Sequence, residues 1–225
     1  MELNYFTGIG RRAVNEDVLC IERISSGCDL YMVIDGMGGH EKGDEAAKIV
    51  ADRILTFLKH SKGPINETVL QKAVQKANLA IKHFNLENKI QSGAAVAGVV
   101  VCQDFNHIFW LGDVKVYCLE KGDLAFESKS HTLFDSLQES NHDFNNENLN
   151  KYKHVLTRSV SGKTKEAEIG YQRLVKEKNE IIICSDGVHD LLGLLELRQL
   201  LSTGDLEEFL LENAEDNYSL IYGRF

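Results

Sequence analysis

Residues 33–47, VIDGMGGHEKGDEAA, decide how this chain folds, because an apolar strand-like run, a glycine-rich turn and the start of a helical pattern follow one another there. Such a turn usually cradles a phosphate, since its backbone N–H groups and the positive end of the helix face the anion. Asp35 stands at the head of the turn, where its charge would repel a phosphate. The turn could therefore bind phosphate directly, or it could bind a cation that in turn binds phosphate.

The composition is that of one globular domain. The 225 residues are 43% hydrophobic and 26% charged, with a net charge of -9. We therefore expect a single domain over residues 1–225. The acidic balance offers no basic surface for nucleic acid and disfavours anionic membranes. No secretory leader pattern or membrane-spanning run is present, so we expect a cytoplasmic protein, and a monomer.

The cysteines form no CxxC pair, and each lies in or beside an apolar run. This pattern predicts buried, reduced thiols in a cytosolic protein, in preference to a disulfide framework or a zinc ribbon. They are Cys20, Cys28, Cys102, Cys118 and Cys184.

Short β-rich runs dominate the chain, and two longer segments have helical periodicity. Residues 44–58 and 67–84 each place their apolar side chains on one helical face, so both helices should pack on a sheet. Shorter helices are expected near 190–201 and 206–213. The expected strands are 4–8, 18–24, 29–34, 95–102, 107–111, 114–120, 180–184 and 218–222.

Residues 135–153 are polar and rich in asparagine. A solvated loop is the general interpretation, but a loop this long inside a compact domain is also typical of a functional flap. We therefore expect a flap-like segment at about 130–153. Many strands with two helix pairs favour sheets enclosed between helical layers.

Five aspartates lie at or beside the ends of the apolar runs. A single aspartate at such a position can also be explained as a turn former. Asp-Gly, a common turn dipeptide, occurs at Asp35 and Asp186. Turn chemistry does not explain why every one of them adjoins a strand. The five are Asp17, Asp35, Asp113, Asp186 and Asp216.

Carboxylates at the edge of a core are costly unless a cation meets them. No lysine or arginine neighbours Asp35, Asp186 or Asp216 in the sequence. If the strand ends converge, the repulsion between these groups predicts a metal cluster. Oxygen ligands without adjacent Cys or His donors favour magnesium or manganese over zinc.

Six segments, taken in order, resemble the motifs of the metal-dependent type 2C serine/threonine protein phosphatases, bacterial branch. They are RAVNED (12–17), IDGMGGHEKGDEAA (34–47), WLGDVKVYCLEKGDL (110–124), VLTRSVSG (155–162), ICSDGVHDLL (183–192) and DNYSLI (216–221). The resemblance implies an α+β fold, a four-layer α-β-β-α sandwich of two central antiparallel sheets flanked by helix pairs. It also implies hydrolysis of phosphoserine and phosphothreonine in proteins by a metal-activated water, without a phosphoenzyme. The expected partners are phosphorylated proteins, the targets of a serine/threonine kinase.

The resemblance implies a core site for two manganese or magnesium ions. Carried over by position, Asp35 would bridge both ions and the Gly36 carbonyl would bind one of them. Asp186 and Asp216 would hold the first ion.

Asp17, with Glu16 beside it, would hold the second ion directly or through water. Asp113 matches an acid that binds a third, weaker metal in several bacterial members. The usual Gly-Asp-Ser-Arg reads Gly-Asp-Val-Lys here, so Val114 and Lys115 remove hydrogen bonds around that acid.

Arg12 matches the arginine that clamps the substrate phosphate, for which its planar guanidinium is suited. The alternative is a solvated surface arginine, a role for which Arg11 is the natural candidate. Met37 stands where eukaryotic members carry a histidine proposed as the general acid. His40 is usual in the bacterial pattern, and it either acts in the site or only orients the loop.

Two other functions remain as alternatives. A catalytically weak regulator that binds phosphoproteins would keep the fold, and Met37 together with the altered Gly-Asp-Val-Lys motivates it. A glycine-loop nucleotide binder is disfavoured, because no Gly-Lys-Ser/Thr follows the loop and Asp35 precedes it.

Overall fold

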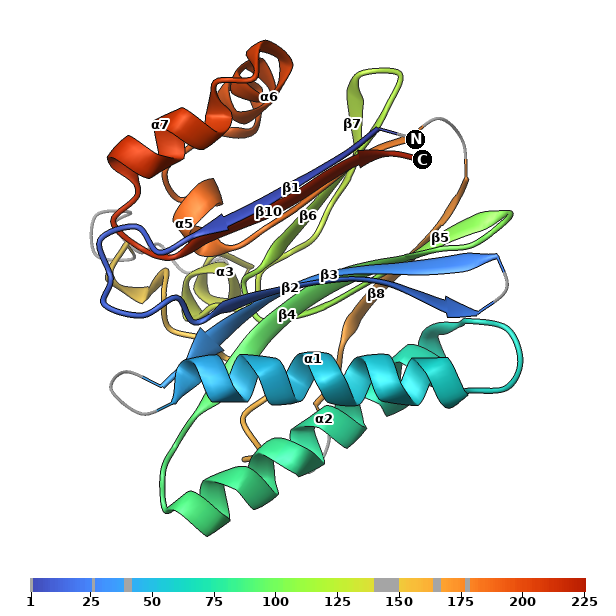
Figure 1. Ribbon diagram of the computed structural model, residues 1–225, viewed down its shortest axis with the longest axis vertical. Helices are drawn as coiled ribbons and strands as arrows, with labels where there is room; N and C mark the ends of the chain where they lie inside the picture. Colours follow the sequence, from blue (N-terminus) through green and yellow to red (C-terminus); the bar gives the residue numbers. More distant parts are fainter. Residues whose placement is uncertain (1, 26, 39–41, 140–149, 164–166, 177–178) are drawn as a thin grey trace.

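Two five-stranded antiparallel sheets pack face to face and carry helices on their outer faces (Figure 1). This computed structural model describes residues 2–25, 27–38, 42–139, 150–163, 167–176 and 179–225. The arrangement confirms the predicted α+β sandwich.

The first sheet has the order β1-β10-β9-β6-β7 and the second the order β2-β3-β4-β5-β8. The first contains β1 (Glu2–Gly8), β10 (Tyr218–Arg224), β9 (Asn179–Cys184), β6 (Lys115–Glu120) and β7 (Asp123–Glu127). The second contains β2 (Asp17–Ser25), β3 (Cys28–Met37), β4 (Gly93–Val101), β5 (Phe105–Leu111) and β8 (Gly170–Val175). The sequence patterns missed β7 and β8, because both are edge strands that form no apolar run: β7 is largely exposed and β8 is half-buried with polar residues among its apolar ones.

The helical layers differ in thickness. Two long helices, α1 (Gly43–His60) and α2 (Glu67–Asn88), cover the second sheet, as the periodicity predicted. The first sheet carries three shorter ones, α5 (Asp186–His189), α6 (Leu194–Thr203) and α7 (Leu206–Asn213). The sequence did not predict α5, which is a single turn directly after β9.

Apolar side chains fill three layers. Successive side chains of a strand point to opposite faces, so neighbouring residues enter different cores. On β3, Val33 lies in the core between the sheets, whereas Ile34 lies in the core beneath α1 and α2. A third core, which includes Leu197 and Leu210, joins the first sheet to α6 and α7.

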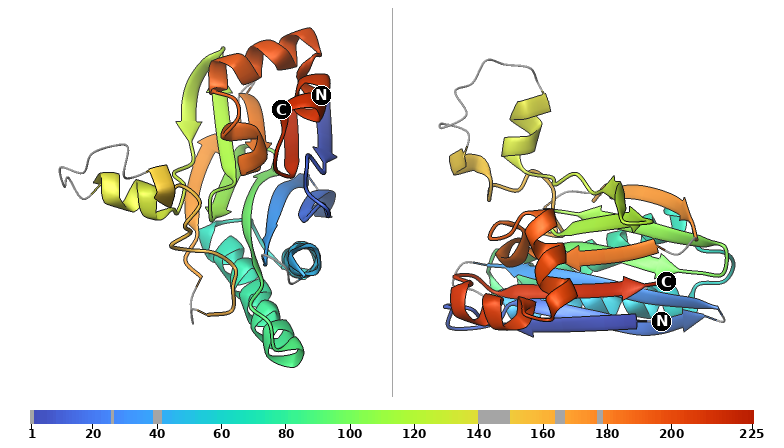
Figure 2. Two further views of the ribbon diagram at one scale, coloured as in Figure 1. Left: turned by 90° about the vertical axis from the view of Figure 1, so that its left-hand side faces the viewer. Right: turned by 90° about the horizontal axis from the view of Figure 1, so that it is seen from above.

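The segment between β7 and β8 projects from one side of the sandwich (Figure 2). It begins with α3 (Leu133–Glu139) and includes the short 3-10 helix η1 (Asn150–Tyr152). Within the expected flap-like segment, residues 133–139 form a helix that the sequence did not predict, where Thr132 accepts a hydrogen bond from the backbone N–H of Asp135 and starts the helix. Residues 140–149, most of the asparagine-rich stretch, lie outside the described residues.

Cys28 and Cys102 form a disulfide, which corrects the expectation of five reduced thiols. The start of β3 lies beside the end of β4 in their antiparallel pairing, where Asp29 faces Val101. This register brings together two cysteines that are 74 residues apart, and spacing along the chain gives no sign of it. The other three cysteines are buried and free, as predicted.

Among the residues that the structure describes, no helix is both long and apolar enough to cross a membrane.

Candidate metal centre

The predicted acids gather at one end of the sandwich because the strands that carry them end there. Asp17 opens β2 and faces Asp35 across the β2–β3 ladder. Asp186 follows β9, Asp216 precedes β10, and Asp113 follows β5. The sheets thus bring together residues that the sequence separates by up to about two hundred positions.

Gly36 lets the end of β3 approach the start of α1. Its backbone N–H donates to the carbonyl of Glu16 at 3.2 Å. A Cβ at Gly36 would lie 2.3 Å from the carbonyl oxygen of Gly43, so no other residue fits without moving the backbone. The close approach places the carbonyl group of Gly36 beside Asp35.

Glu16 has a structural role that the sequence did not reveal. Its Oε1 accepts a hydrogen bond from the N–H of Gly43, the first residue of α1, at 3.2 Å. A carboxylate at a helix N-terminus interacts favourably with the helix dipole. The helix therefore begins at Gly43, one residue before the predicted start at Asp44, with Glu16 in place of a local capping side chain.

Asp35 and Asp186 lie close enough for each carboxyl group to affect the pKa of the other. Burial, followed by the charges of Asp17, Asp186 and Asp113, raises the pKa of Asp35 well above its usual range. Burial is also the largest cause of the raised pKa of Asp186. The ionised forms of both groups are therefore unfavourable without a cation.

Asp17 lies in the deepest part of this cluster, with 8% of its surface exposed. One carboxylate oxygen accepts a hydrogen bond from the Ser185 hydroxyl at 2.8 Å, while the other, Oδ1, is buried without a protein partner. Burial raises the pKa of Asp17 to about 7, although the hydrogen bonds from Ser185 and Ser219 act in the opposite direction.

Asp113 lines a hollow of about 190 Å³ that Asp186 and Asp190 also line, so this hollow is continuous with the cluster. Burial, together with the charge of Asp186, raises the pKa of Asp113 to about 6. Lys115 lines the same hollow and forms a 2.6 Å ion pair with Glu127. Its positive charge disfavours a further cation beside Asp113.

Arg12 lies at the rim of the cluster, and its side chain is 60% exposed. Its guanidinium forms a hydrogen-bonded ion pair with Asp216, and this contact raises the pKa of Arg12. Arg11 pairs only with the exposed Glu215, at 3.5 Å. The two neighbouring arginines therefore separate as the sequence suggested, with Arg12 facing the acids.

Ser185 and Asn217 position the acids, and the sequence analysis missed both. Ser185 donates to Asp17 and accepts from the backbone N–H of Ser219, which ties β9 and β10 to β2. Asn217 accepts from the N–H of Glu16 and donates to the carbonyls of two residues of the 9–16 loop. The sequence could have indicated Ser185 and Asn217 only through their positions directly beside Asp186 and Asp216 in the chain.

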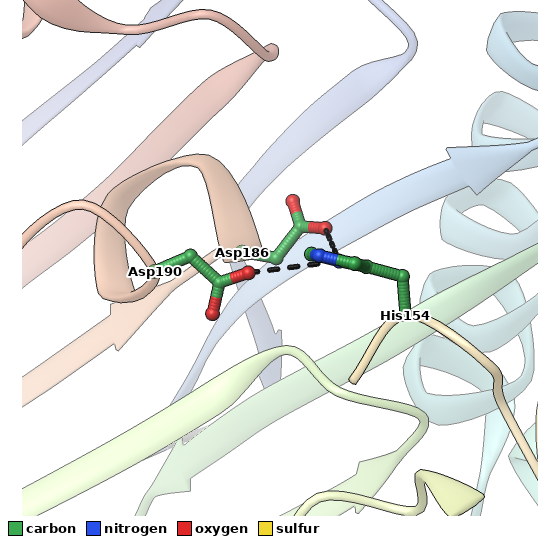
Figure 3. Close-up of side chains that lie close together, drawn as sticks. All are labelled: His154, Asp186 and Asp190. Atoms are coloured by element: carbon green, nitrogen blue, oxygen red, sulfur yellow. Dashed lines mark ion pairs between the residues drawn. The ribbon is translucent and has the colours of Figure 1, made fainter. Parts of the chain in front are cut away.

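His154 also reaches the cluster, which no spacing in the sequence predicts. Its Nδ1 lies 3.9 Å from a carboxylate oxygen of Asp186 and 3.6 Å from one of Asp190 (Figure 3). Asp190 also pairs with His189 at 3.2 Å. Burial alone would raise the pKa of Asp190, but the contacts with His189 and His154 lower it.

The loop after β3 is only partly described. Met37 ends β3 in a half-buried position. His40 lies outside the described residues.

The donor set fits divalent cations. Four carboxylates with oxygen atoms only are what magnesium and manganese prefer, and the lone buried Oδ1 of Asp17 needs a positive partner. Arg12 is the one guanidinium that the described residues bring to these acids, and one positive charge does not balance them. Divalent cations held between Asp17, Asp35, Asp186 and Asp216 would relieve this repulsion.

Fold and site together define a family. The sequence pattern described as Protein phosphatase 2C matches residues 8–215. The chain belongs to this family of protein phosphatases.

Similar proteins from bacteria are named serine/threonine phosphatases. The serine/threonine phosphatase stp of Listeria monocytogenes is 24% identical over 212 residues, which cover 90% of this chain and 84% of that protein. The crystal structure of Stp1 from Staphylococcus aureus, at 23% identity, covers all of this chain and 94% of its own, with a TM-score of 0.87. The catalytic domain of the phosphatase PstP, a structure in complex with two manganese ions, has a TM-score of 0.81 at 22% identity and covers 98% of this chain and 96% of its own.

Proposed function

We propose that residues 1–225 form one catalytic domain, a metal-dependent phosphatase that hydrolyses phosphoserine and phosphothreonine in proteins. The convergence of Asp17, Asp35, Asp186 and Asp216, with the orphaned Oδ1 of Asp17, carries this proposal. Family membership and the names of the relatives support the same activity.

Two manganese or magnesium ions are proposed for the core site. Asp35, Asp186 and Asp216 are the proposed ligands of one ion, and Asp35 and Asp17 those of the other. Bound there, the ions would neutralise phosphate charge and activate water. A third, weaker ion is proposed beside Asp113, in the hollow that Asp186 and Asp190 also line, and the charge of Lys115 in the same lining would weaken its binding.

The chain's own residues bind and orient the substrate. Arg12 is exposed at the rim, so its guanidinium can leave Asp216 and donate to two oxygens of a phosphate monoester. With an ion in the core site, Asp216 would serve as one of its ligands, and Arg12 would be available to the phosphate. Ser185 keeps Asp17 in its orientation throughout, because the bond between them is buried.

A phosphatase assay with metal tests the proposal. Peptides carrying phosphothreonine, phosphoserine or phosphotyrosine are compared, with manganese or with EDTA. We expect manganese-dependent turnover of the first two, which EDTA and Asp35→Ala abolish. Absence of turnover with every divalent metal, with phosphopeptide binding retained, would favour the regulator that binds without hydrolysis.

A further inference from the structure

A groove of about 410 Å³ lies beside the metal centre and is not part of it. Its floor includes Leu111 and Leu156, and its walls carry the side chains of Arg158, Lys163 and Glu168. Hydroxyl groups of three further residues line it, those of Thr157, Ser159 and Ser161.

Strand register places the groove at the same end of the sandwich as the acids. Val160, within the 156–163 segment, pairs with Ala94 of β4, and Ala94 pairs with Gly36 of β3. Leu111 ends β5, the next strand after β4. Because neighbouring strands lie ~4.8 Å apart, the backbone of Leu111 lies roughly 10 Å from the backbone of Asp35. An extended polypeptide spans ~3.4 Å per residue and covers that distance in about three residues.

The walls of the groove are fastened to α2 by amide side chains spaced seven residues apart. Asn85 donates to the carbonyl of Ser161, and Asn78 accepts from the N–H of Gly162 at 2.8 Å. Gln71 holds the other wall by accepting from the N–H of Ile169 and donating to the carbonyl of Ala167. A spacing of seven puts the three amides on one face of the helix, along which the segment before β8 runs (Figure 2).

Gly162 makes this close attachment possible. Its φ is +72°, and a Cβ there would lie 2.5 Å from the Cα of Lys82 on α2. The backbone at residues 161–162 and at residues 167–169 is therefore held against α2 before any ligand arrives.

Cations dominate the walls, although the chain as a whole carries a net charge of -9. Arg158 approaches Glu168 only to 3.9 Å, and both side chains are at least half exposed. Lys163 donates to the neutral amide of Gln91 at 3.0 Å. Both cations therefore remain able to pair with an acidic ligand.

We propose that this groove binds the polypeptide next to the phosphorylated residue of a substrate and selects an acidic residue about three positions away. The inference rests on the proposed phosphatase activity. An apolar neighbour of that residue would contact Leu156, and the acidic side chain would pair with Arg158 and Lys163.

The test compares short phosphothreonine peptides with glutamate or lysine at the third position on either side of the phosphothreonine. Both kcat/KM and binding, by fluorescence anisotropy in EDTA, are measured for each peptide. At the third position on one side of the phosphothreonine, we expect the glutamate peptide to exceed the lysine peptide by about fivefold in both kcat/KM and affinity. Arg158→Glu should reverse this preference, whereas Arg158→Lys should keep most of it. Lys62→Glu, the same charge change at an exposed position between α1 and α2, should leave the preference intact.

Two failures are distinguishable. Turnover with equal kcat/KM and equal binding for glutamate and lysine peptides would overturn the groove proposal alone. An acidic preference in binding that Arg158→Glu reverses, without turnover of any phosphopeptide or of p-nitrophenyl phosphate, would overturn the proposed activity and support the groove.

Discussion

The two ends of β3 differ in what holds them. At one end a disulfide joins Cys28 to Cys102 on β4. At the other end, seven residues and roughly 24 Å along the strand, Asp35 lies among carboxyl groups that repel one another. The contrast shows that the apolar cores and the covalent link stabilise a strand whose functional end is unfavourable without a cation.

Asp35→Asn should have the largest effect. We expect kcat with manganese to fall by at least about 10³-fold, because Asp35 is the proposed ligand of both ions and its charge is lost. The melting temperature in EDTA should rise, since a neutral amide replaces a buried carboxyl group with a raised pKa. The matched control is Asp29→Asn, at the disulfide end of the same strand. A loss of less than tenfold would contradict the assignment of Asp35.

The acidic end should make the stability of the metal-free protein depend on pH. The folded-state pKa of Asp17 is about 7 and that of Asp113 about 6, above the value of ~3.9 in the unfolded chain. The folded protein therefore binds protons more tightly, and this stabilisation is complete below about pH 4 and is lost as pH rises through 7. Melting temperatures in EDTA should fall between pH 5 and pH 8, and manganese should raise them most at pH 8. A flat profile in EDTA would show that burial does not raise the pKa values of Asp17 and Asp113 as described.

Removing the link at the other end should affect stability alone. Cys28→Ser should lower the free energy of unfolding by about 2–4 kcal/mol, since the disulfide closes a long loop of the unfolded chain. We expect kcat to remain at the wild-type value. Urea denaturation with and without a reducing agent measures the effect, and the reduced wild type should match the variant. Labelling of five free thiols in the unreduced protein would rule the disulfide out.

Arg12→Ala should reduce activity less than Asp35→Asn does, and it should act on KM more than on kcat. We expect KM for phosphopeptides to rise roughly tenfold, with a lesser change in kcat, because Arg12 is the proposed ligand of the substrate phosphate. Asp186→Asn should instead act mainly on kcat. Arg11→Ala serves as the control, since its partner Glu215 lies outside the cluster. Equal effects of the two arginine variants would refute the assignment.

Much of this architecture is predictable from the sequence, and the misses have physical causes. Apolar periodicity located α1, α2 and the buried strands, because their side chains enter the cores. The edge strand β8 carries a mixed surface, and its place depends on pairing with β5. Positions beside strands indicated the candidate acids, but only the fold shows that Ser185 orients Asp17 and that His154 reaches Asp186.

The three amide side chains of α2 that hold the groove allow peptide selectivity to change independently of the chemistry of hydrolysis. Gln71, Asn78 and Asn85 connect an outer helix to the groove walls, without contact with the acids. A substitution on that helix can thus shift peptide selectivity while leaving the chemistry of hydrolysis intact. Related chains could diversify their targets through a helix that never meets the phosphate.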